Sequence, residues 1–376
     1  MKTLTFCAFT LLHLAVSGME PVSAAPLPDR LGRPSLISPD AIHAPLTDVQ
    51  SVGPALVMVG GSGHVLLRNA NGETSQASVP VDLLLTAVHF IDASQGWAVG
   101  HDGVILHSTD AGNTWIKQLD GSQISPLLLE RALAEVTRLQ DASAAAPEDQ
   151  DLVAALDNAL FALDDAKASG ASGPSRPLLD VWFRDADEGW AVGAYGMIVH
   201  TKDGGRNWEY VSALPNPDRL HLNAVLGLPD GTLLVAGEGG LLHRSEDGGK
   251  HWHPPQQLTQ ASLYKLMRLA DGRLLALGFG GTLLSSPDLA QTWKSIKTPA
   301  PVGLYGGRQL ADGAVVLSGQ GGVLLYSSDG EHFKLWHGAD INSLLGVAQV
   351  DAEHLALIGS SGMQLVALAT IREQLQ

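Results

Sequence analysis

Residues 96–108 read Gly-Trp-Ala-Val-Gly-His-Asp-Gly-Val-Ile-Leu-His-Ser, and residues 189–201 repeat the phrase as Gly-Trp-Ala-Val-Gly-Ala-Tyr-Gly-Met-Ile-Val-His-Thr. Within it lies a Gly-x-x-Gly step followed by an apolar run, and this step occurs seven times. The first glycines of the steps are Gly60, Gly100, Gly193, Gly237, Gly278, Gly319 and Gly359. Their spacings of 40, 93, 44, 41, 41 and 40 residues give a period of about 40 with one insertion. Such a period is typical of repeat architectures, propellers among them.

Each repeat contains four short segments with strand composition. In the second repeat they are residues 84–90, 96–100, 104–108 and 114–119, which are rich in β-branched and aromatic residues and bounded by Gly and Asp. Four antiparallel strands at this period make one propeller blade. First strands are expected around Leu46, Val88, Val181, Val225, Leu266, Tyr305 and Val347. The sequence therefore predicts an all-β fold, a seven-bladed β-propeller that forms a single domain over residues 26–376.

The two ends of this predicted ring differ from the other repeats. The seventh repeat lacks residues for a good fourth strand after Val366, and residues 33–43 precede the first blade with no strand partner of their own. We expect residues 33–43 to add a strand to the last blade, because closure removes the exposed sheet edges that promote aggregation.

The long spacing between the second and third repeats predicts an inserted α-helical hairpin between blades two and three, over residues 123–175. Residues 124–140 and 151–167 each carry Leu at steps close to i, i+4 and i+7, with many alanines between them. Two interpretations stay open. The helices pack only on each other and on the side of the propeller, or the hairpin as a whole docks a partner.

The N-terminus predicts secretion. Lys2 precedes an apolar run from Leu4 to Val16, and small residues around Ala24 offer a cleavage site, so residues 1–25 are expected to be a signal peptide. Cys7, the one cysteine of the chain, lies within this segment. The formal net charge of −16 argues against binding to nucleic acid and to anionic membrane surfaces.

Four repeats carry the pattern Ser/Thr-x-Asp-x-x-x-x-Trp, known as the Asp-box or BNR repeat. Its Asp is expected to accept hydrogen bonds from backbone N–H groups in a turn, and its Trp to fill the gap between neighbouring sheets. A weaker fifth copy has Ser327, Asp329 and Phe333. The four full copies are Ser108, Asp110 and Trp115; Thr201, Asp203 and Trp208; Ser245, Asp247 and Trp252; and Ser286, Asp288 and Trp293. We interpret these residues as structural.

The two phrases at residues 96–108 and 189–201 closely resemble the photosystem II stability/assembly factor family of seven-bladed propellers. The resemblance covers about residues 44–368 apart from the insertion. It implies a non-enzymatic factor of the periplasm, or of the thylakoid lumen in a photosynthetic organism, that helps to assemble a membrane-protein complex. The implied partner is an integral membrane protein or its assembly intermediate. The factor would be a monomeric propeller, peripheral to the membrane at most, without a cofactor. Because some relatives are thought to accompany resistance–nodulation–division (RND) transporters, an accessory subunit of such a transporter is the alternative.

Position within this family suggests four client-facing residues on or near first strands: His89, Trp182, Lys265 and Arg308. Exposed Trp and Arg side chains often anchor interfaces. We expect Ala at Lys265 and Arg308 to weaken client capture without lowering the melting temperature.

Asp-boxes also occur in sialidases, so a sialidase-like glycoside hydrolase is the enzymatic alternative. Such a site needs three converging arginines, and Arg184, Arg268 and Arg308 lie near the ends of first strands. Their unequal offsets from the glycine step predict different orientations, and the Arg-Ile-Pro stretch near the start of sialidases is absent. The sequence therefore predicts no enzyme and no catalytic residues.

Metal-binding signals are weak. His251 and His253 flank a structural Trp, and no third ligand follows at a metal-type spacing. Residues 185–189 are the nearest approach to a calcium loop, but they fit a β-turn before a strand equally well. No metal site is expected.

Overall fold

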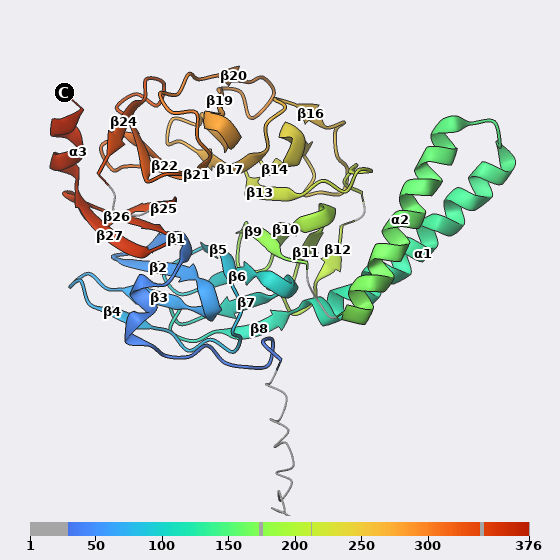
Figure 1. The fold of residues 1–376 in the computed structure, drawn as a ribbon, viewed down its shortest axis with the longest axis horizontal. Coiled ribbons are helices and arrows are strands. Elements are labelled where there is room, and N and C mark those ends of the chain that lie inside the picture. Colours follow the sequence, from blue (N-terminus) through green and yellow to red (C-terminus); the bar gives the residue numbers. More distant parts are fainter. Residues whose placement is uncertain (1–28, 173–175, 212, 339–341, 376) are drawn as a thin grey trace, which may run out of the picture.

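The computed structural model describes residues 29–172, 176–211, 213–338 and 342–375. Seven antiparallel sheets lie side by side around a common centre, and two long helices project from one side (Figure 1). In each sheet the strands follow one another in chain order from the centre outwards. The prediction of an all-β, seven-bladed propeller is confirmed. The predicted signal peptide, residues 1–25, lies outside the described residues.

The seven blades have the following strands. Blade one comprises β1 (Leu46–Val52), β2 (Ala55–Gly60), β3 (Val65–Arg68) and β4 (Thr74–Gln76). Blade two comprises β5 (Leu85–Phe90), β6 (Gly96–Gly100), β7 (Ile105–Ser108) and β8 (Ile116–Leu119). Blade three comprises β9 (Leu178–Phe183), β10 (Gly189–Gly193), β11 (Ile198–Thr201) and β12 (Glu209–Tyr210). Blade four comprises β13 (Leu222–Gly227), β14 (Leu233–Gly237), β15 (Leu241–Ser245) and β16 (Gln256–Gln257). Blade five comprises β17 (Leu263–Arg268), β18 (Leu274–Gly278), β19 (Leu283–Ser286) and β20 (Lys294–Ser295). Blade six comprises β21 (Leu304–Gln309), β22 (Val315–Gly319), β23 (Val323–Ser327) and β24 (Lys334–His337). Blade seven comprises β25 (Leu344–Gln349), β26 (His354–Gly359) and β27 (Gly362–Ala367).

The Gly-x-x-Gly step is the turn between the second and third strands of a blade, and each of its glycines has a physical reason. A Cβ on Gly60 would lie 2.1 Å from the carbonyl oxygen of Pro45, just before β1. The equivalent Cβ on Gly100 would lie 2.3 Å from the carbonyl oxygen of Leu84. The second glycine adopts φ values such as +70° at Gly103, where side chains are disfavoured. The step thus lets the turn touch the backbone that enters the first strand.

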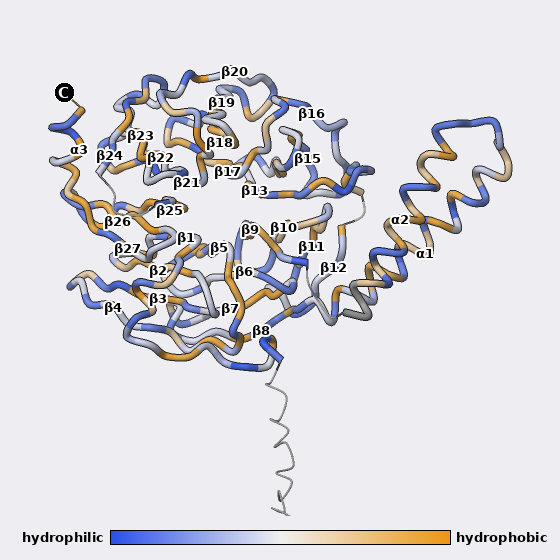
Figure 2. Tube along the Cα trace, viewed as in Figure 1, coloured by the Kyte–Doolittle hydropathy of each residue, from blue (hydrophilic) through white to orange (hydrophobic). Residues whose placement is uncertain are grey.

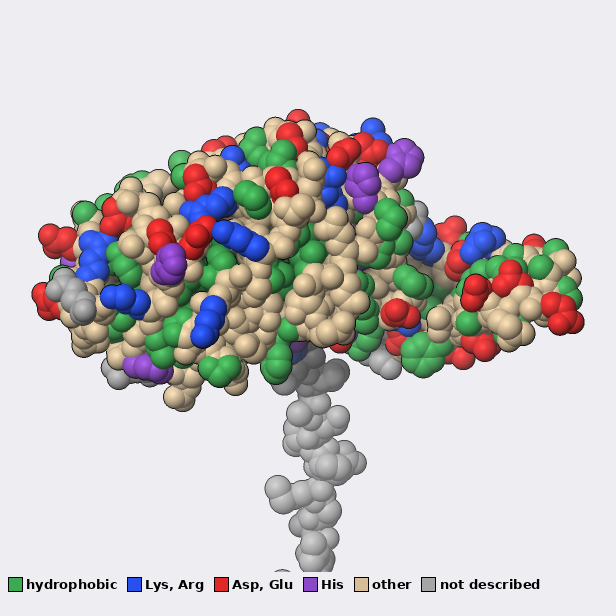
Figure 3. Space-filling view, turned by 90° about the horizontal axis from the view of Figure 1, so that it is seen from above, with side chains coloured by type: hydrophobic (Ala, Val, Ile, Leu, Met, Phe, Trp, Pro, Cys, Tyr) green, Lys and Arg blue, Asp and Glu red, His purple; other side chains and the backbone are tan. Residues whose placement is uncertain are grey.

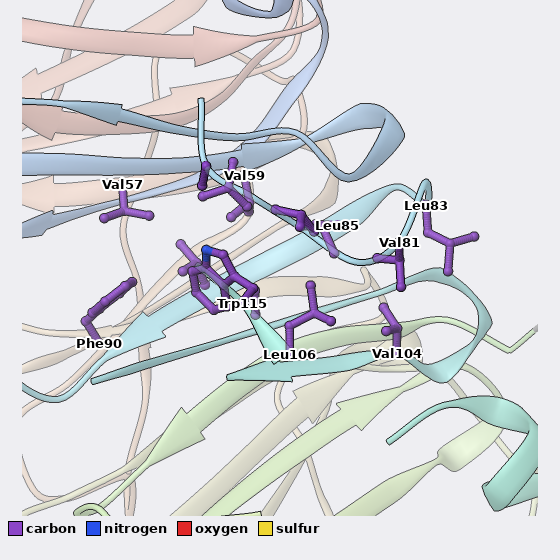
Figure 4. Packing of buried hydrophobic residues seen from close by; sticks show 14 of the residues in the cluster. Val57, Val59, Val81, Leu83, Leu85, Phe90, Val104, Leu106 and Trp115 are labelled. Atoms are coloured by element: carbon purple, nitrogen blue, oxygen red, sulfur yellow. The ribbon is translucent and has the colours of Figure 1, made fainter. Parts of the chain in front are cut away.

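The core consists of apolar layers between neighbouring blades. Between blades one and two, Val57 and Val59 of β2 face Leu106 of β7, and Trp115 packs edge-on against Phe90 with ring centroids 5.9 Å apart (Figure 4). Figure 2 shows the same distribution of hydropathy: many residues in the strands of the ring are hydrophobic, and the turn between the two long helices is hydrophilic. Buried apolar area of this kind is the main stabilising term of a large fold.

The Gly-Trp pair of the repeat phrase serves this layer. Trp97 is fully buried and stacks on Phe183 of the next blade, with ring centroids 3.6 Å apart, and on His107 at 4.5 Å. A Cβ on Gly96 would lie 2.6 Å from the ring of Phe90. The glycine therefore accommodates one aromatic ring, and the tryptophan joins two blades.

Residues 33–43 do not add a strand to the last blade, so that prediction is wrong. Pro39–His43 form a 3-10 helix, η1, beside β27, and within the described residues the last sheet has three strands. Residues 31–35 bind at the first two blades instead: Ser35 N donates to Val79 O at 3.0 Å, and Leu31 is buried with the core there. The ring closes by packing of β1 against β25 and β26.

Helices α1 (Gly121–Ala145) and α2 (Gln150–Ser172) follow β8 and precede β9. They pack on each other through Val136, Leu139 and Leu163, and Figure 1 shows them as an arm that leaves the ring at its base. Asp120 caps α1, and Ile124 in its first turn is buried with the core between blades two and three. A third helix, α3 (Leu368–Gln374), ends the described chain. No helix among the described residues is long and apolar enough to span a bilayer.

Candidate functional site

A cavity of about 260 Å³ lies at the centre of the ring and is lined by first strands of the blades. The third residues of the first strands occupy equivalent positions, and all of them except Ala224 line the cavity. In chain order these residues are Asp48, Ala87, Asp180, Ala224, Lys265, Gly306 and Gly346. The three small lining residues, Ala87, Gly306 and Gly346, leave the space open, and the three charged residues determine its electrostatics.

The three charged residues form one ionic group. Lys265 Nζ lies 3.4 Å from Asp180 Oδ1, while Asp180 Oδ2 accepts a 3.0 Å hydrogen bond from Val225 N of the next blade. Asp48 Oδ2 accepts from Val88 N at 3.0 Å in the same way. Burial disfavours the charged form of Lys265, but the two carboxylates outweigh burial and hold its pKa above the ordinary value. Burial raises the pKa of Asp48, although Lys265 opposes this shift. Lys265 and Asp180 thus form an ion pair, and the carboxylates of Asp48 and Asp180 hold adjacent first strands together through backbone hydrogen bonds.

Hydroxyl groups connect the first strands next to this ionic group. Thr47 Oγ1 donates to Leu85 O at 2.6 Å, and Thr86 Oγ1 donates to Leu178 O at 2.7 Å. Each Thr sits at the irregularity of its first strand, where the pairing register shifts. The strand irregularity thus turns a side chain toward the following blade.

The four predicted client-facing residues are not brought together as one set. His89, Lys265 and Arg308 line the central cavity, whereas Trp182 is not among its lining residues. Trp182 instead stacks on Trp190 at 5.6 Å, and a Cβ on Gly227 would lie 2.0 Å from its ring. Burial lowers the pKa of His89 to about 4, and its Nε2 lies 3.1 Å from Phe183 O. Of the four, Arg308 is the exposed one.

The three arginines that a sialidase-like site would need do not converge. Arg308 and Arg268 share a shallow hollow of about 360 Å³ at the ends of β17 and β21. Arg184 lies elsewhere, where it pairs with Glu188 and lies over the ring of Trp190 at 5.2 Å.

The structure places the Asp-box residues on the outer turns between third and fourth strands. In the first box, Asp110 Oδ1 accepts from Ser108 Oγ at 2.8 Å and from Thr114 N at 2.9 Å. Trp115 Nε1 donates to Gly112 O at 2.8 Å. The same hydrogen bond from a Ser or Thr hydroxyl to the carboxylate recurs in the other three boxes and in the weaker fifth at Ser327 and Asp329. The contacts of these side chains are local, within the turn or with the adjoining blade core.

The candidate metal residues behave as surface groups. His251 Nδ1 lies 2.6 Å from Asp247 Oδ2 within an Asp-box, and Asp185 Oδ1 caps the turn before β10 by accepting from Asp187 N and Glu188 N. Among the described side chains, no three His, Cys, Asp or Glu converge as metal ligands.

Sequence reasoning missed Asp48 and Asp180, although both left a signal. Each is a carboxylate at the third position of a first strand that begins with Leu, and a buried charge requires a partner. Aligning the seven first strands by their leading Leu would have placed Lys265 in the same register.

Comparison with known proteins shows which family part of this chain resembles. Residues 174–261, which include β9 and β13, match the family model described as photosynthesis system II assembly factor YCF48. The chain is 39% identical over 75 residues to a photosystem II assembly lipoprotein Ycf48 of Synechococcus sp. (strain CC9902), which is 20% of this chain and 22% of that protein. It is 36% identical over 67 residues to the photosystem II stability/assembly factor HCF136, chloroplastic, of Arabidopsis thaliana, which is 18% of this chain and 16% of that protein. The matches thus span less than a quarter of each relative.

Solved propellers match over far more of the chain but at low identity. A structure titled "YCF48 bound to D1 peptide" aligns with a TM-score of 0.58 and 18% identity, over 88% of this chain and 95% of that one. Virginiamycin B lyase from Staphylococcus aureus aligns with a TM-score of 0.60 and 10% identity, over 89% and 99%. These likenesses show the fold, which binding proteins and enzymes share. The resemblance seen in the Gly-Trp phrase at residues 189–201 is confirmed by this match: residues 174–261 resemble the photosystem II stability/assembly factor-like family of β-propellers with BNR-type repeats.

Proposed function

We propose that this protein is a non-enzymatic assembly or stability factor that holds a segment of an integral membrane protein at the mouth of its central cavity. The observation that carries the proposal is the family match over residues 174–261, because this segment supplies two of the seven strands around the cavity and the carboxylate of Asp180. The named relatives are assembly factors, and one propeller of the same fold is named as bound to a D1 peptide.

The cavity itself supports binding over catalysis. Its volume of about 260 Å³ is below the ~300–1,000 Å³ of typical small-molecule sites. Lys265 pairs with Asp180, and Asp48 and Asp180 accept hydrogen bonds from the adjacent backbone, so these groups hold the ring together. Arg308 and Arg268 at the neighbouring hollow provide exposed positive charge for a client.

The location that goes with this function is the periplasm, or the lumen of a photosynthetic organism. It is supported by the signal-peptide pattern of residues 1–25. Cell fractionation and the N-terminal mass of the secreted protein test it, with cleavage near Ala25 as the expected result.

Arg308 is the residue that tests client capture. Lys265 is unsuitable for this test, because its replacement by Ala would leave buried Asp180 without its cation. Contrary to the expectation from the sequence, Lys265→Ala should therefore lower the melting temperature. We expect Arg308→Glu to reduce the membrane protein recovered with the tagged protein from envelope membranes by about tenfold, the scale of one interface anchor. Lys250→Glu, which makes the same charge change at an exposed site on an Asp-box turn, is the control and should recover the wild-type amount.

Two outcomes would overturn this function. Equal recovery with Arg308→Glu and wild type would exclude Arg308 as a client-binding residue. Hydrolysis of a substrate in a fluorogenic glycoside panel would favour a sialidase-like hydrolase over an assembly factor. Mass spectrometry of the recovered protein also tests the alternative of an RND transporter accessory subunit, which predicts such a transporter as the main partner.

A further inference from the structure

A groove of about 500 Å³ lies where the helical arm leaves the ring, and we call it the hairpin groove. Its walls are one face of α1, one face of α2 and the loops that follow β10 and β12 of blade three. It shares no lining residue with the central cavity. Figure 3 shows the arm as a separate lobe beside the body of the propeller, with Asp and Glu side chains along it.

The groove is hollow because α2 presents small side chains to it. Ala155, Ala159, Ala162 and Ala166 recur at helical spacing and line one wall. Opposite them, residues 214–217 of the loop after β12 read Leu-Pro-Asn-Pro and contribute apolar surface. Ala159 and Ala166 are buried, whereas Ala155 and Ala162 are only partly covered, so this part of the face leaves room for the side chains of another molecule.

Guanidinium groups and tyrosine rings gather at one end of this hollow. Arg176 Nη2 lies 2.6 Å from Asp165 Oδ2, and Arg219 Nη2 pairs with the same carboxylate oxygen. Both guanidiniums lie over the ring of Tyr195, at 5.4 and 5.6 Å, and Tyr195 is 46% exposed. Arg131 lies over the ring of Tyr210 at 5.2 Å. Two cations that share one carboxylate retain attraction for a second anion.

The charge of the groove differs in sign from that of the chain. Three arginines (Arg131, Arg176 and Arg219) and two carboxylates (Glu135 and Asp165) give a local formal charge of 3 − 2 = +1, against −16 for the whole sequence. The groups are partly dehydrated, because the side chains of Arg176 and Arg219 are only 11% and 20% exposed, and this burial lowers the pKa of Arg176. Electrostatic attraction is stronger in such surroundings than in bulk water.

The loop holds Arg219 in place. Arg219 has a φ of +53°, which is uncommon for a residue with a side chain, and Arg219 N donates to Asn216 O at 3.1 Å. Asn216 also exchanges two side-chain hydrogen bonds with the backbone of Leu220. A strained residue that its neighbours fix in this way is often found at a functional site.

We propose that the hairpin groove binds an extended peptide of a partner protein through an acidic side chain flanked by small apolar residues. The carboxylate would pair with the arginines beside Tyr195, as Asp165 already does, and the apolar neighbours would lie on the alanine face of α2. An arginine binds a carboxylate more specifically than a lysine does, because its planar guanidinium can donate two parallel hydrogen bonds to the two carboxylate oxygens. This second site does not depend on the proposed function of the central cavity.

Fluorescence anisotropy with a defined probe tests the proposal on the full secreted chain. The probe is a fluorescein-labelled peptide Gly-Ala-Leu-Glu-Leu-Ala-Gly with a blocked C-terminus, compared with the same peptide carrying Gln in place of Glu. A third peptide has Gln and a free C-terminal carboxylate. We expect the Glu peptide to bind at least about tenfold more tightly than either of the others. Tighter binding of the free C-terminus would overturn the choice of a side-chain carboxylate.

Two variants on α2 separate the groove from the rest of the helix. Ala162→Phe fills the hollow without changing charge, and Ala154→Phe places the same ring on an exposed part of α2 that does not line the groove. Loss of probe binding with Ala162→Phe alone, at unchanged melting temperature, supports the site, and Arg219→Gln should weaken binding by about tenfold. Unchanged affinity with Ala162→Phe overturns it. The proposal is also overturned if sedimentation shows that the wild-type protein is a dimer and that Ala162→Phe is a monomer, because the groove would then be a contact between two copies of the chain.

Discussion

Single glycines set the geometry of each blade, and two adjacent residues allow a direct test. Gly60 and Gly61 belong to the same turn, but an added Cβ would lie 2.1 Å from Pro45 O at Gly60 and 3.8 Å from it at Gly61. Gly60→Ala should therefore lower the free energy of unfolding by about 1–3 kcal/mol, the usual cost of forcing extra atoms into a packed site. Thermal or urea unfolding measures the change.

Gly61→Ala is the control for this prediction. It should change stability by less than about 1 kcal/mol, and a small increase is possible because alanine restricts the unfolded chain. Equal losses in the two variants would show that general flexibility of the turn, and not the approach to Pro45, requires glycine there.

Several site residues could be read from the sequence one at a time, but their contacts could not. The positions of His89, Lys265 and Arg308 on first strands placed them at the cavity. Trp182 occupies the same strand position as His89, yet it packs toward blade four because Gly227 leaves room for its ring. Such a preference depends on the neighbouring blade, which a single repeat does not encode.

At the scale of elements, the Asp-box turn joins a third strand to a fourth by side-chain hydrogen bonds. Asp110 accepts from the backbone N of Thr114 and from the hydroxyl of Ser108. Asp110→Ala should lower the free energy of unfolding by about 1 kcal/mol, the net value of a typical hydrogen bond in a folded protein. Chemical denaturation followed by tryptophan fluorescence is a suitable measurement, since Trp115 belongs to the same turn.

Asp187→Ala provides the comparison, because Asp187 is exposed and contributes only backbone groups to its turn hydrogen bonds. It should leave the midpoint unchanged. If Asp110→Ala and Asp187→Ala have the same denaturation midpoint, the Asp110 carboxylate does not stabilise the turn, and its glycine and tryptophan are sufficient.

The order of elements was largely predictable, and the exceptions have physical causes. Strand composition and the glycine period located all seven first strands, because each blade repeats the same alternation of apolar and turn residues. The segment at residues 33–43 was assigned wrongly. Ser38 caps a 3-10 helix by accepting from Asp40 N, with Pro39 at its first position, and these local signals outweigh the need of the last sheet for a fourth strand.

For the whole molecule, buried histidines predict sensitivity to mild acid. Burial lowers the pKa of His243 and of His89 to about 4, below the ordinary value of 6.5. The unfolded chain therefore binds more protons than the fold as pH falls from about 6.5 to 4, and stability decreases over this interval. At pH 5 each such histidine costs about 2 kcal/mol relative to neutral pH.

His243→Phe tests this origin of acid sensitivity. The side chain of His243 is almost fully buried, so a phenylalanine should keep the packing and remove the titration. The loss of stability between pH 7 and pH 5, measured by urea unfolding, should shrink by about 2 kcal/mol in His243→Phe. It should stay unchanged in His337→Phe, an exposed control. An unchanged loss in both variants would contradict the prediction.

A second interval lies at lower pH. Hydrogen bonds from Asn207, first from its side chain and then from its backbone N, lower the pKa of Asp203 to about 2. The stabilisation that this Asp-box carboxylate provides is present above its ordinary pKa of 3.8 and is lost as pH falls toward 2. The histidine and carboxylate effects thus act in separate pH ranges.

Strand β1 pairs with β2 at once, but it packs against β25 and β26, and η1 packs against β27, only after the last blade has been synthesised. A chain that stops before residue 344 would leave Leu46 and Met58 of blade one without the side chain of Ile358 that covers them. Truncated chains would therefore expose an apolar edge of blade one, and we expect them to aggregate more readily than the full chain.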